Sequence, residues 1–188
     1  MTRLTSRPKI LFPESNLFLH RIILPVILLA GCSSLNEVKT YKTSKNNTVQ
    51  ISVATKHESQ ELIGSGYLKS RPEVIVTFSK TFVGTSFIEG KLLVVLTAPP
   101  EIKSLKDTLL LKIGSQKYKL KFFSVIPNQA EDGLVFSAAT DLKATIIEEL
   151  GKAKEIKLRI YGDKSPLTYV FNELQVESLQ KFSREAPG

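Results

Sequence analysis

The sequence feature that most constrains the fold is a pair of alternating segments joined by the dipeptide Gly114-Ser115. Apolar residues occupy every second position from Leu109 to Ile113 and again from Tyr118 to Phe122. Such alternation is typical of strands that bury one face of a sheet. A two-residue loop that begins with glycine suits a type II′ turn between antiparallel strands. The sequence therefore predicts an antiparallel β-hairpin at this point.

Strand patterns recur along the rest of the chain without the alternating helices of a parallel α/β fold. We expect a mainly β domain over residues 48–188, an antiparallel β-sandwich of about nine strands with one or two short helices. The polar segment 32–47 is predicted to be a flexible tether. The predicted strands are 48–54, 73–79, 81–87, 91–98, 108–113, 116–125, 134–137, 156–161 and 167–171.

Two short segments carry helical signals. In the first, Thr140 or Asp141 is predicted to cap a helix with apolar residues from Leu142 to Ala153, and Gly151 marks its end. The second is predicted to follow Asn172, with one apolar side made by the residues Val176, Leu179 and Phe182.

The amino-terminal part of the chain has a different character. Residues 22–30 form a nine-residue uncharged apolar run, preceded by Arg21 and followed by small residues. At a rise of 1.5 Å per residue this run covers about 14 Å, roughly half of a hydrocarbon core about 30 Å thick. The pattern is typical of a secretory signal peptide rather than of a membrane-spanning helix.

Directly after the apolar run, Leu29-Ala30-Gly31-Cys32 resembles the lipobox of bacterial lipoproteins, and all four positions match. The resemblance implies cleavage between Gly31 and Cys32, a signal peptide over residues 1–31, and lipid attached to the sulfur and the new amino terminus of Cys32. It thus implies a cell-envelope location. In the enterobacterial version of this class an aspartate after the cysteine marks inner-membrane retention, so Ser33 favours the outer membrane.

Few residues suggest catalysis. His57 is the only histidine after the proposed cleavage site, and the sequence from His57 to Glu61 lacks the second histidine of a zinc-protease motif. We interpret this stretch as an exposed polar loop and expect no metal site and no cofactor. Carboxylates that could in principle serve a hydrolase are Glu131, Asp132, Glu148, Glu149, Asp163 and Glu173.

Charge placement on the predicted hairpin suggests a binding surface. Lys117, Lys119 and Lys121 share the face opposite the apolar residues, and Lys112 is expected to join them. Such a face would attract phosphate-bearing surfaces such as lipid headgroups or lipopolysaccharide, although solvated lysines also protect exposed strands from aggregation. Residues 1–31 carry +3 of the chain's +8, so the remainder is only mildly basic at +5, which does not indicate a nucleic-acid binder.

These observations predict a non-enzymatic envelope lipoprotein whose β domain binds another envelope component, either a protein or an anionic lipid, or supports an assembly there. Two alternatives stay open at this stage: an envelope hydrolase that uses some of these carboxylates, and a carrier whose β body encloses a lipid.

Overall fold

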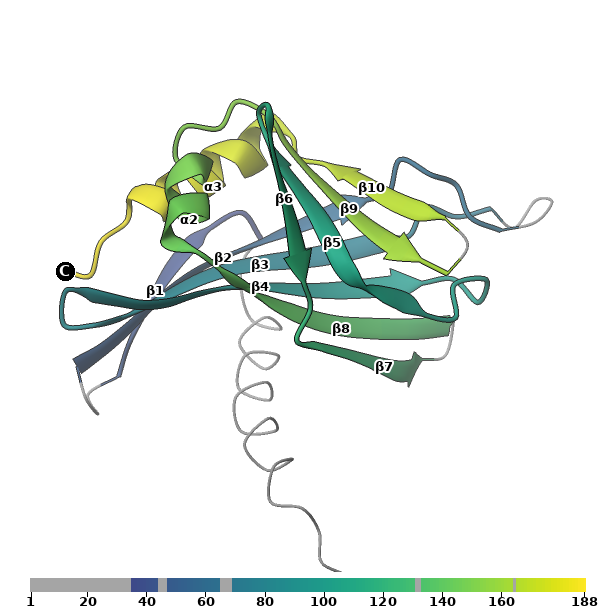
Figure 1. Ribbon diagram of the computed structural model, residues 1–188, viewed down its shortest axis with the longest axis horizontal. Helices are drawn as coiled ribbons and strands as arrows, with labels where there is room; N and C mark the ends of the chain where they lie inside the picture. Colours follow the sequence, from purple (N-terminus) through teal and green to yellow (C-terminus); the bar gives the residue numbers. More distant parts are fainter. Residues whose placement is uncertain (1–34, 44–46, 65–68, 131–132, 164) are drawn as a thin grey trace, which may run out of the picture. The chain divides into compact units, whose positions relative to one another are not determined.

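Ten strands and two helices make up the part of the chain that the computed structural model describes, namely residues 35–43, 47–64, 69–130, 133–163 and 165–188. Residues 34–188 belong to one compact unit. The strands form two antiparallel sheets that pack face to face, with both helices at one end (Figure 1). The prediction of a mainly β antiparallel sandwich of about nine strands with one or two short helices is confirmed, with ten strands and two helices in the described residues.

The larger sheet has six strands in the order β1-β2-β3-β4-β8-β7. Long central strands dominate it, and their inward residues are largely Val, Ile, Leu and Phe. Its strands are β1 (Val38–Thr43), β2 (Thr48–Glu58), β3 (Glu73–Val83), β4 (Ser86–Ala98), β7 (Ser124–Ala130) and β8 (Gly133–Leu142).

The smaller sheet has four strands in the order β10-β9-β5-β6. It comprises β5 (Leu105–Ile113), β6 (Gln116–Lys121), β9 (Ile156–Gly162) and β10 (Pro166–Val170). The predicted hairpin at Gly114-Ser115 is confirmed as β5–β6, in which Ile113 pairs with Gln116. Gly114 has a φ of 56°, a left-handed conformation that glycine adopts without steric cost.

The two sheets and the helices share one core. Helices α2 (Ala144–Leu150) and α3 (Glu173–Arg184) cover the inner face of the larger sheet where the smaller sheet ends (Figure 1). Phe182 of α3 lies 6.5 Å from Phe78 of β3 between ring centroids. At Gly90 of β4 an added Cβ would come within 2.6 Å of the Leu142 carbonyl oxygen and 2.7 Å of the Ile147 side chain, so glycine permits this close packing of β4 with β8 and α2.

The domain begins earlier than predicted. Residues 38–43, assigned to the tether, form β1 and pair with β2 from Val38–Val53 to Thr43–Thr48. The tether prediction is therefore wrong for this part of segment 32–47. The physical reason is that β1 is an edge strand with no fully buried side chain, so its sequence lacks the apolar alternation that reveals other strands.

Two strand boundaries also differ from the prediction. Segments 73–79 and 81–87 were expected to be separate strands, but β3 runs unbroken to Val83 and turns at Gly84-Thr85 into β4. Segment 116–125 was expected to be one strand, but it divides between the two sheets. Phe122 donates its backbone N–H to Asp107 of β5, whereas Phe123 donates to Ala139 of β8. Segment 116–125 contains no Gly or Pro that would mark a break, and the two pairings are made with segments from different parts of the chain, so the prediction of a single strand is wrong here.

The first predicted helix starts later than expected. Thr140, Asp141 and Leu142 belong to β8, and Lys143 precedes α2 without a side-chain cap. The Thr140 hydroxyl instead donates a 2.8 Å hydrogen bond to the carbonyl of Lys121. The second helix is confirmed, with Asn172 as its cap: the Asn172 side chain accepts from the backbone N–H of Gln175, and the Gln175 side chain accepts from that of Asn172. Neither described helix has the length and apolarity that crossing a bilayer would require.

Candidate functional site

The outward face of the smaller sheet gathers six basic side chains, and we call it the basic sheet face. Alternation in β5, β6 and β9 buries residues such as Leu111 and Leu158 and turns their neighbours outward. The strand register then sets the basic residues side by side. The members of the face are Lys112, Lys117, Lys119, Lys121, Lys157 and Arg159.

The register shows how closely these charges are placed. Lys112 of β5 pairs directly with Lys117 of β6 on one side and with Lys157 of β9 on the other. Two residues before Lys112 on β5, Leu110 pairs with Lys119 of β6 on one side and with Arg159 of β9 on the other. Opposed like charges in neighbouring strands destabilise a sheet. Glu155, which lies near both Lys112 and Lys157, offsets part of this repulsion.

Acidic residues neutralise the basic sheet face only in part. Glu155 lies 2.6 Å from the ammonium of Lys157 and 3.9 Å from that of Lys112, and these two lysines hold the pKa of Glu155 below its usual range. Asp107 lies 3.6 Å from Lys121. Lys117 and Lys119 have no ion-pair partner among the residues that the structure describes. The face thus keeps a positive excess, with its two unpaired lysines on the edge strand β6.

The sequence predicted four of these six residues. Lys112, Lys117, Lys119 and Lys121 lie on one face as expected, because the hairpin register is fixed by its two-residue turn. Lys157 and Arg159 were missed. Their outward direction could be read from the alternation of Ile156, Leu158 and Ile160, but the pairing of β9 with β5 joins segments more than forty residues apart and is set by tertiary structure.

The carboxylates considered for a hydrolase lie on separate elements. Glu148 and Glu149 are neighbours on α2, Glu173 begins α3, and Asp163 follows β9 with its backbone N–H bonded to the Ser104 carbonyl. Glu131 and Asp132 lie outside the described residues. Within the described part of the chain, no three His, Cys, Asp or Glu side chains come together as metal ligands.

His57 lies in the core, and the prediction of an exposed loop from His57 to Glu61 is wrong for this residue and for the buried Ser59. β2 continues to Glu58, so His57 keeps the inward direction of Ile51 and Val53. Its Nε2 lies 2.8 Å from the Thr55 hydroxyl, and its ring packs against Phe171 at a centroid distance of 4.0 Å. Burial lowers the pKa of His57 to about 4, and the backbone of Val170 offsets only part of this effect.

Glu61 follows β2 and forms a hydrogen bond with the backbone of β10. One carboxylate oxygen accepts hydrogen bonds from the backbone N–H of Thr168 at 2.6 Å and from the Ser59 hydroxyl at 2.7 Å. Burial would raise the pKa of Glu61, but these hydrogen bonds outweigh it and hold the pKa below its usual range. Burial, and then the Glu61 charge, raise the pKa of Tyr169 far above its ordinary value. The hydrogen bonds of Glu61 thus join the segment that follows β2 to β10.

Lys80 is a charged residue that is buried in the core. It points inward from β3, and its ammonium donates to the carbonyls of Ser183, at 3.0 Å, and Glu185. It also lies 5.1 Å from the centroid of the Phe182 ring. Burial lowers the pKa of Lys80, and the Glu185 carboxylate opposes this shift. Cations favour the carbonyl end of a helix, so Lys80 fixes the end of α3 to the larger sheet.

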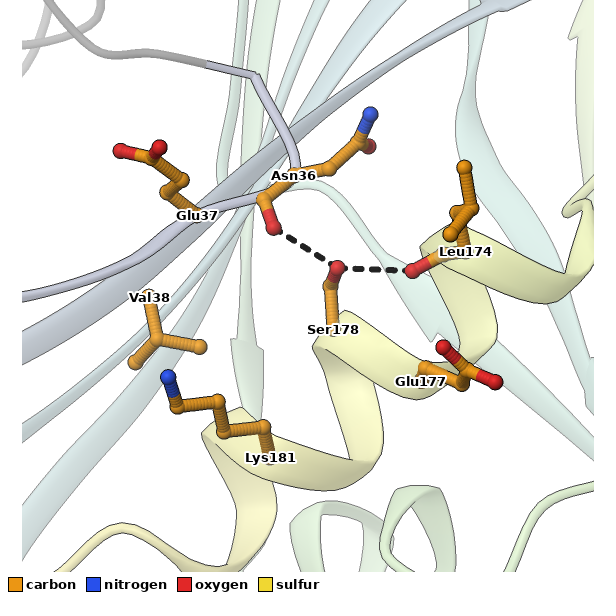
Figure 2. Close-up of a pocket in the computed structure, with 7 residues that line it drawn as sticks. All are labelled: Asn36, Glu37, Val38, Leu174, Glu177, Ser178 and Lys181. Carbon is orange, nitrogen blue, oxygen red and sulfur yellow. Dashed lines mark hydrogen bonds between the residues drawn. The ribbon is translucent and has the colours of Figure 1, made fainter.

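A pocket of about 500 Å³ lies between the start of the domain and α3 (Figure 2). Its α3 side is made by Leu174, Glu177, Ser178 and Lys181, and residues 36–38 form the opposite side. The Ser178 hydroxyl lies 2.7 Å from the carbonyl oxygens of both Asn36 and Leu174. No local sequence pattern predicts this pocket, because it joins segments that are about 140 residues apart.

Gly31 and Cys32, the proposed cleavage and lipidation sites, lie outside the described residues. Comparisons with protein-family models, with curated proteins and with solved structures find no match for this chain.

Proposed function

We propose that the protein is a lipid-anchored, non-enzymatic binding module of the bacterial cell envelope, and that the basic sheet face binds a phosphate-bearing envelope lipid. The lipobox-like segment Leu29-Ala30-Gly31-Cys32 supports the anchor, and Ser33 favours the outer membrane. Two or three acyl chains on Cys32 would hold the protein firmly, since each buried methylene contributes about 0.8 kcal/mol.

The observation that carries the binding role is the positive excess of the basic sheet face, where Lys117 pairs in register with Lys112 and neither Lys117 nor Lys119 has an ion-pair partner among the described residues. Phosphate groups placed over this face would pair with the ammonium groups that lack an acidic partner. Each lysine close to an anionic membrane surface contributes about 1 kcal/mol at physiological ionic strength. The attraction decays over a Debye length of about 10 Å at 0.1 M salt, so the binding should weaken strongly as salt is added.

The test compares two triple variants of the domain spanning residues 34–188, a compact unit with its own core. In the first, Lys117, Lys119 and Lys121 become Gln. In the control, the exposed lysines Lys42, Lys103 and Lys143, which lie elsewhere on the surface, become Gln, so the net charge changes equally.

Binding is measured by co-sedimentation with anionic phosphatidylglycerol vesicles and, separately, with lipopolysaccharide at low salt. The first variant should lose on the order of 100-fold in affinity, from three contributions of about 1 kcal/mol each, and the control should lose little. Loss on only one of the two surfaces identifies the phosphate source. Equal losses in both variants would show that net charge alone acts and would reject the basic sheet face as a binding site.

The anchor is tested by Cys32→Ser in the full-length chain. The thiol is the only cysteine sulfur in the sequence, so this change should abolish metabolic labelling with palmitate and leave uncleaved precursor. Undiminished labelling of the variant would refute the lipoprotein assignment.

A further inference from the structure

The backbone of Asn36 is fixed to the domain at both of its polar groups. Its N–H donates to the Ala54 carbonyl of β2 at 2.8 Å, and its carbonyl lies 2.7 Å from the Ser178 hydroxyl of α3, whose proton it shares with the Leu174 carbonyl. Helix α3 is itself held to β2, because the Gln175 side chain donates to the Lys56 carbonyl at 2.8 Å. The rigid part of the domain therefore extends to within four residues of Cys32.

This short connection limits the distance between the domain and the anchor. An extended chain advances at most about 3.6 Å per residue, so the Cα atoms of Cys32 and Asn36 can be no more than about 14 Å apart. The headgroup layer on each side of a bilayer is about 5 to 8 Å thick. With lipid on Cys32, the surface around Asn36 has to lie on or just above this layer.

The side chains around Asn36 suit a membrane interface. Leu35 precedes it and is 43% exposed, and Leu174, on the rim of the pocket, is 66% exposed. Leucine side chains that reach the interface gain free energy from the burial of apolar area. Further along α3, Lys181 offers an ammonium group to lipid phosphate, and Glu177 adds a negative charge to the same pocket wall (Figure 2).

We infer that the surface formed by Leu35, Leu174, Lys181 and the pocket between Asn36 and α3 lies against the bilayer that holds the lipid anchor. This anchor-side surface is formed by α3 and by the residues that precede and begin β1. The basic sheet face lies on different strands, β5, β6 and β9. The inference rests on the proposed lipidation of Cys32. Because the surface carries charges of both signs, its contact with lipid should depend little on salt.

Fluorescence of a single introduced tryptophan tests this inference, since the chain contains no tryptophan. Leu174→Trp places the probe on the anchor-side surface. Phe123→Trp is the control: residue 123 is 51% exposed and directly precedes β7, at the opposite edge of the larger sheet from β1. Five strand spacings separate these edges, or about 24 Å.

The variants are expressed with the signal peptide, purified in the lipidated form and reconstituted in vesicles of phosphatidylcholine, which has no net charge to attract the basic sheet face and whose acyl chains carry bromine. The Leu174→Trp probe should lose at least half of its emission relative to unbrominated vesicles, and the Phe123→Trp probe should lose almost none. Inserting twenty Gly and Ser residues after Ser34 should restore the emission of the Leu174→Trp probe, because the anchor then no longer sets the distance.

The results separate two kinds of failure. Palmitate labelling and flotation with the vesicles report the anchor independently of the fluorescence. If the protein is labelled and floats, but both probes are quenched equally or the insertion changes nothing, the anchor-side surface is assigned wrongly while the lipoprotein proposal survives. If the protein is neither labelled nor floats, the lipoprotein proposal fails and this inference fails with it.

Discussion

Acidification should destabilise the domain through His57. The unfolded chain binds a proton at the ordinary pKa of 6.5, whereas burial lowers the folded-state pKa to about 4. Between these values the unfolded state binds more protons, so the free energy of unfolding falls as the pH falls below 6.5. The loss amounts to about 2 kcal/mol at pH 5 and approaches about 3 kcal/mol near pH 4, since one pKa unit corresponds to about 1.4 kcal/mol.

The assay is urea unfolding of the 34–188 domain at a series of pH values, followed by far-ultraviolet circular dichroism. His57 is the only histidine in this part of the chain, so the change in unfolding free energy between pH 7 and 5 reports the protonation of His57. The control is His57→Leu, which is apolar and does not titrate. Its unfolding free energy should stay nearly constant over the same interval. A similar pH slope in both proteins would refute the assignment to His57.

Three further substitutions test packing and polar contacts, each measured by the free energy of unfolding. Lys80→Met removes the donor to the Ser183 carbonyl and should cost about 1 to 3 kcal/mol; unchanged amide exchange at the end of α3 would contradict its anchoring role. Glu61→Gln should cost about 1 to 2 kcal/mol at pH 7 through weaker hydrogen bonding to Thr168. Because the folded-state pKa of Glu61 lies below 4.5, that difference should vanish as the pH falls through the folded-state value, and a difference that persists in acid would contradict the reasoning. Gly90→Ala forces a Cβ against the backbone of β8 and should cost about 1 to 3 kcal/mol, whereas a neutral effect would show that β4 and β8 adjust.

Local sequence determined the features that depend on neighbouring residues. The β5–β6 hairpin follows from alternation and a glycine-first turn, and α3 follows from Asn172 and its apolar spacing. The four hairpin lysines share a face for the same reason. The buried position of His57 also follows from the sequence. If the alternation of Ile51 and Val53 is continued, the next inward positions are Thr55 and His57.

Tertiary structure decided what depends on segments far apart in the chain. Strand β1 has almost no apolar signal and exists because β2 offers it a pairing edge. The switch between sheets at Phe122 and Phe123, the arrival of Lys157 and Arg159 beside Lys112, and the fixing of Asn36 against α3 all require long-range hydrogen bonds. A local pattern specifies which face of a strand is apolar, but the partner strand is chosen by packing of the whole core.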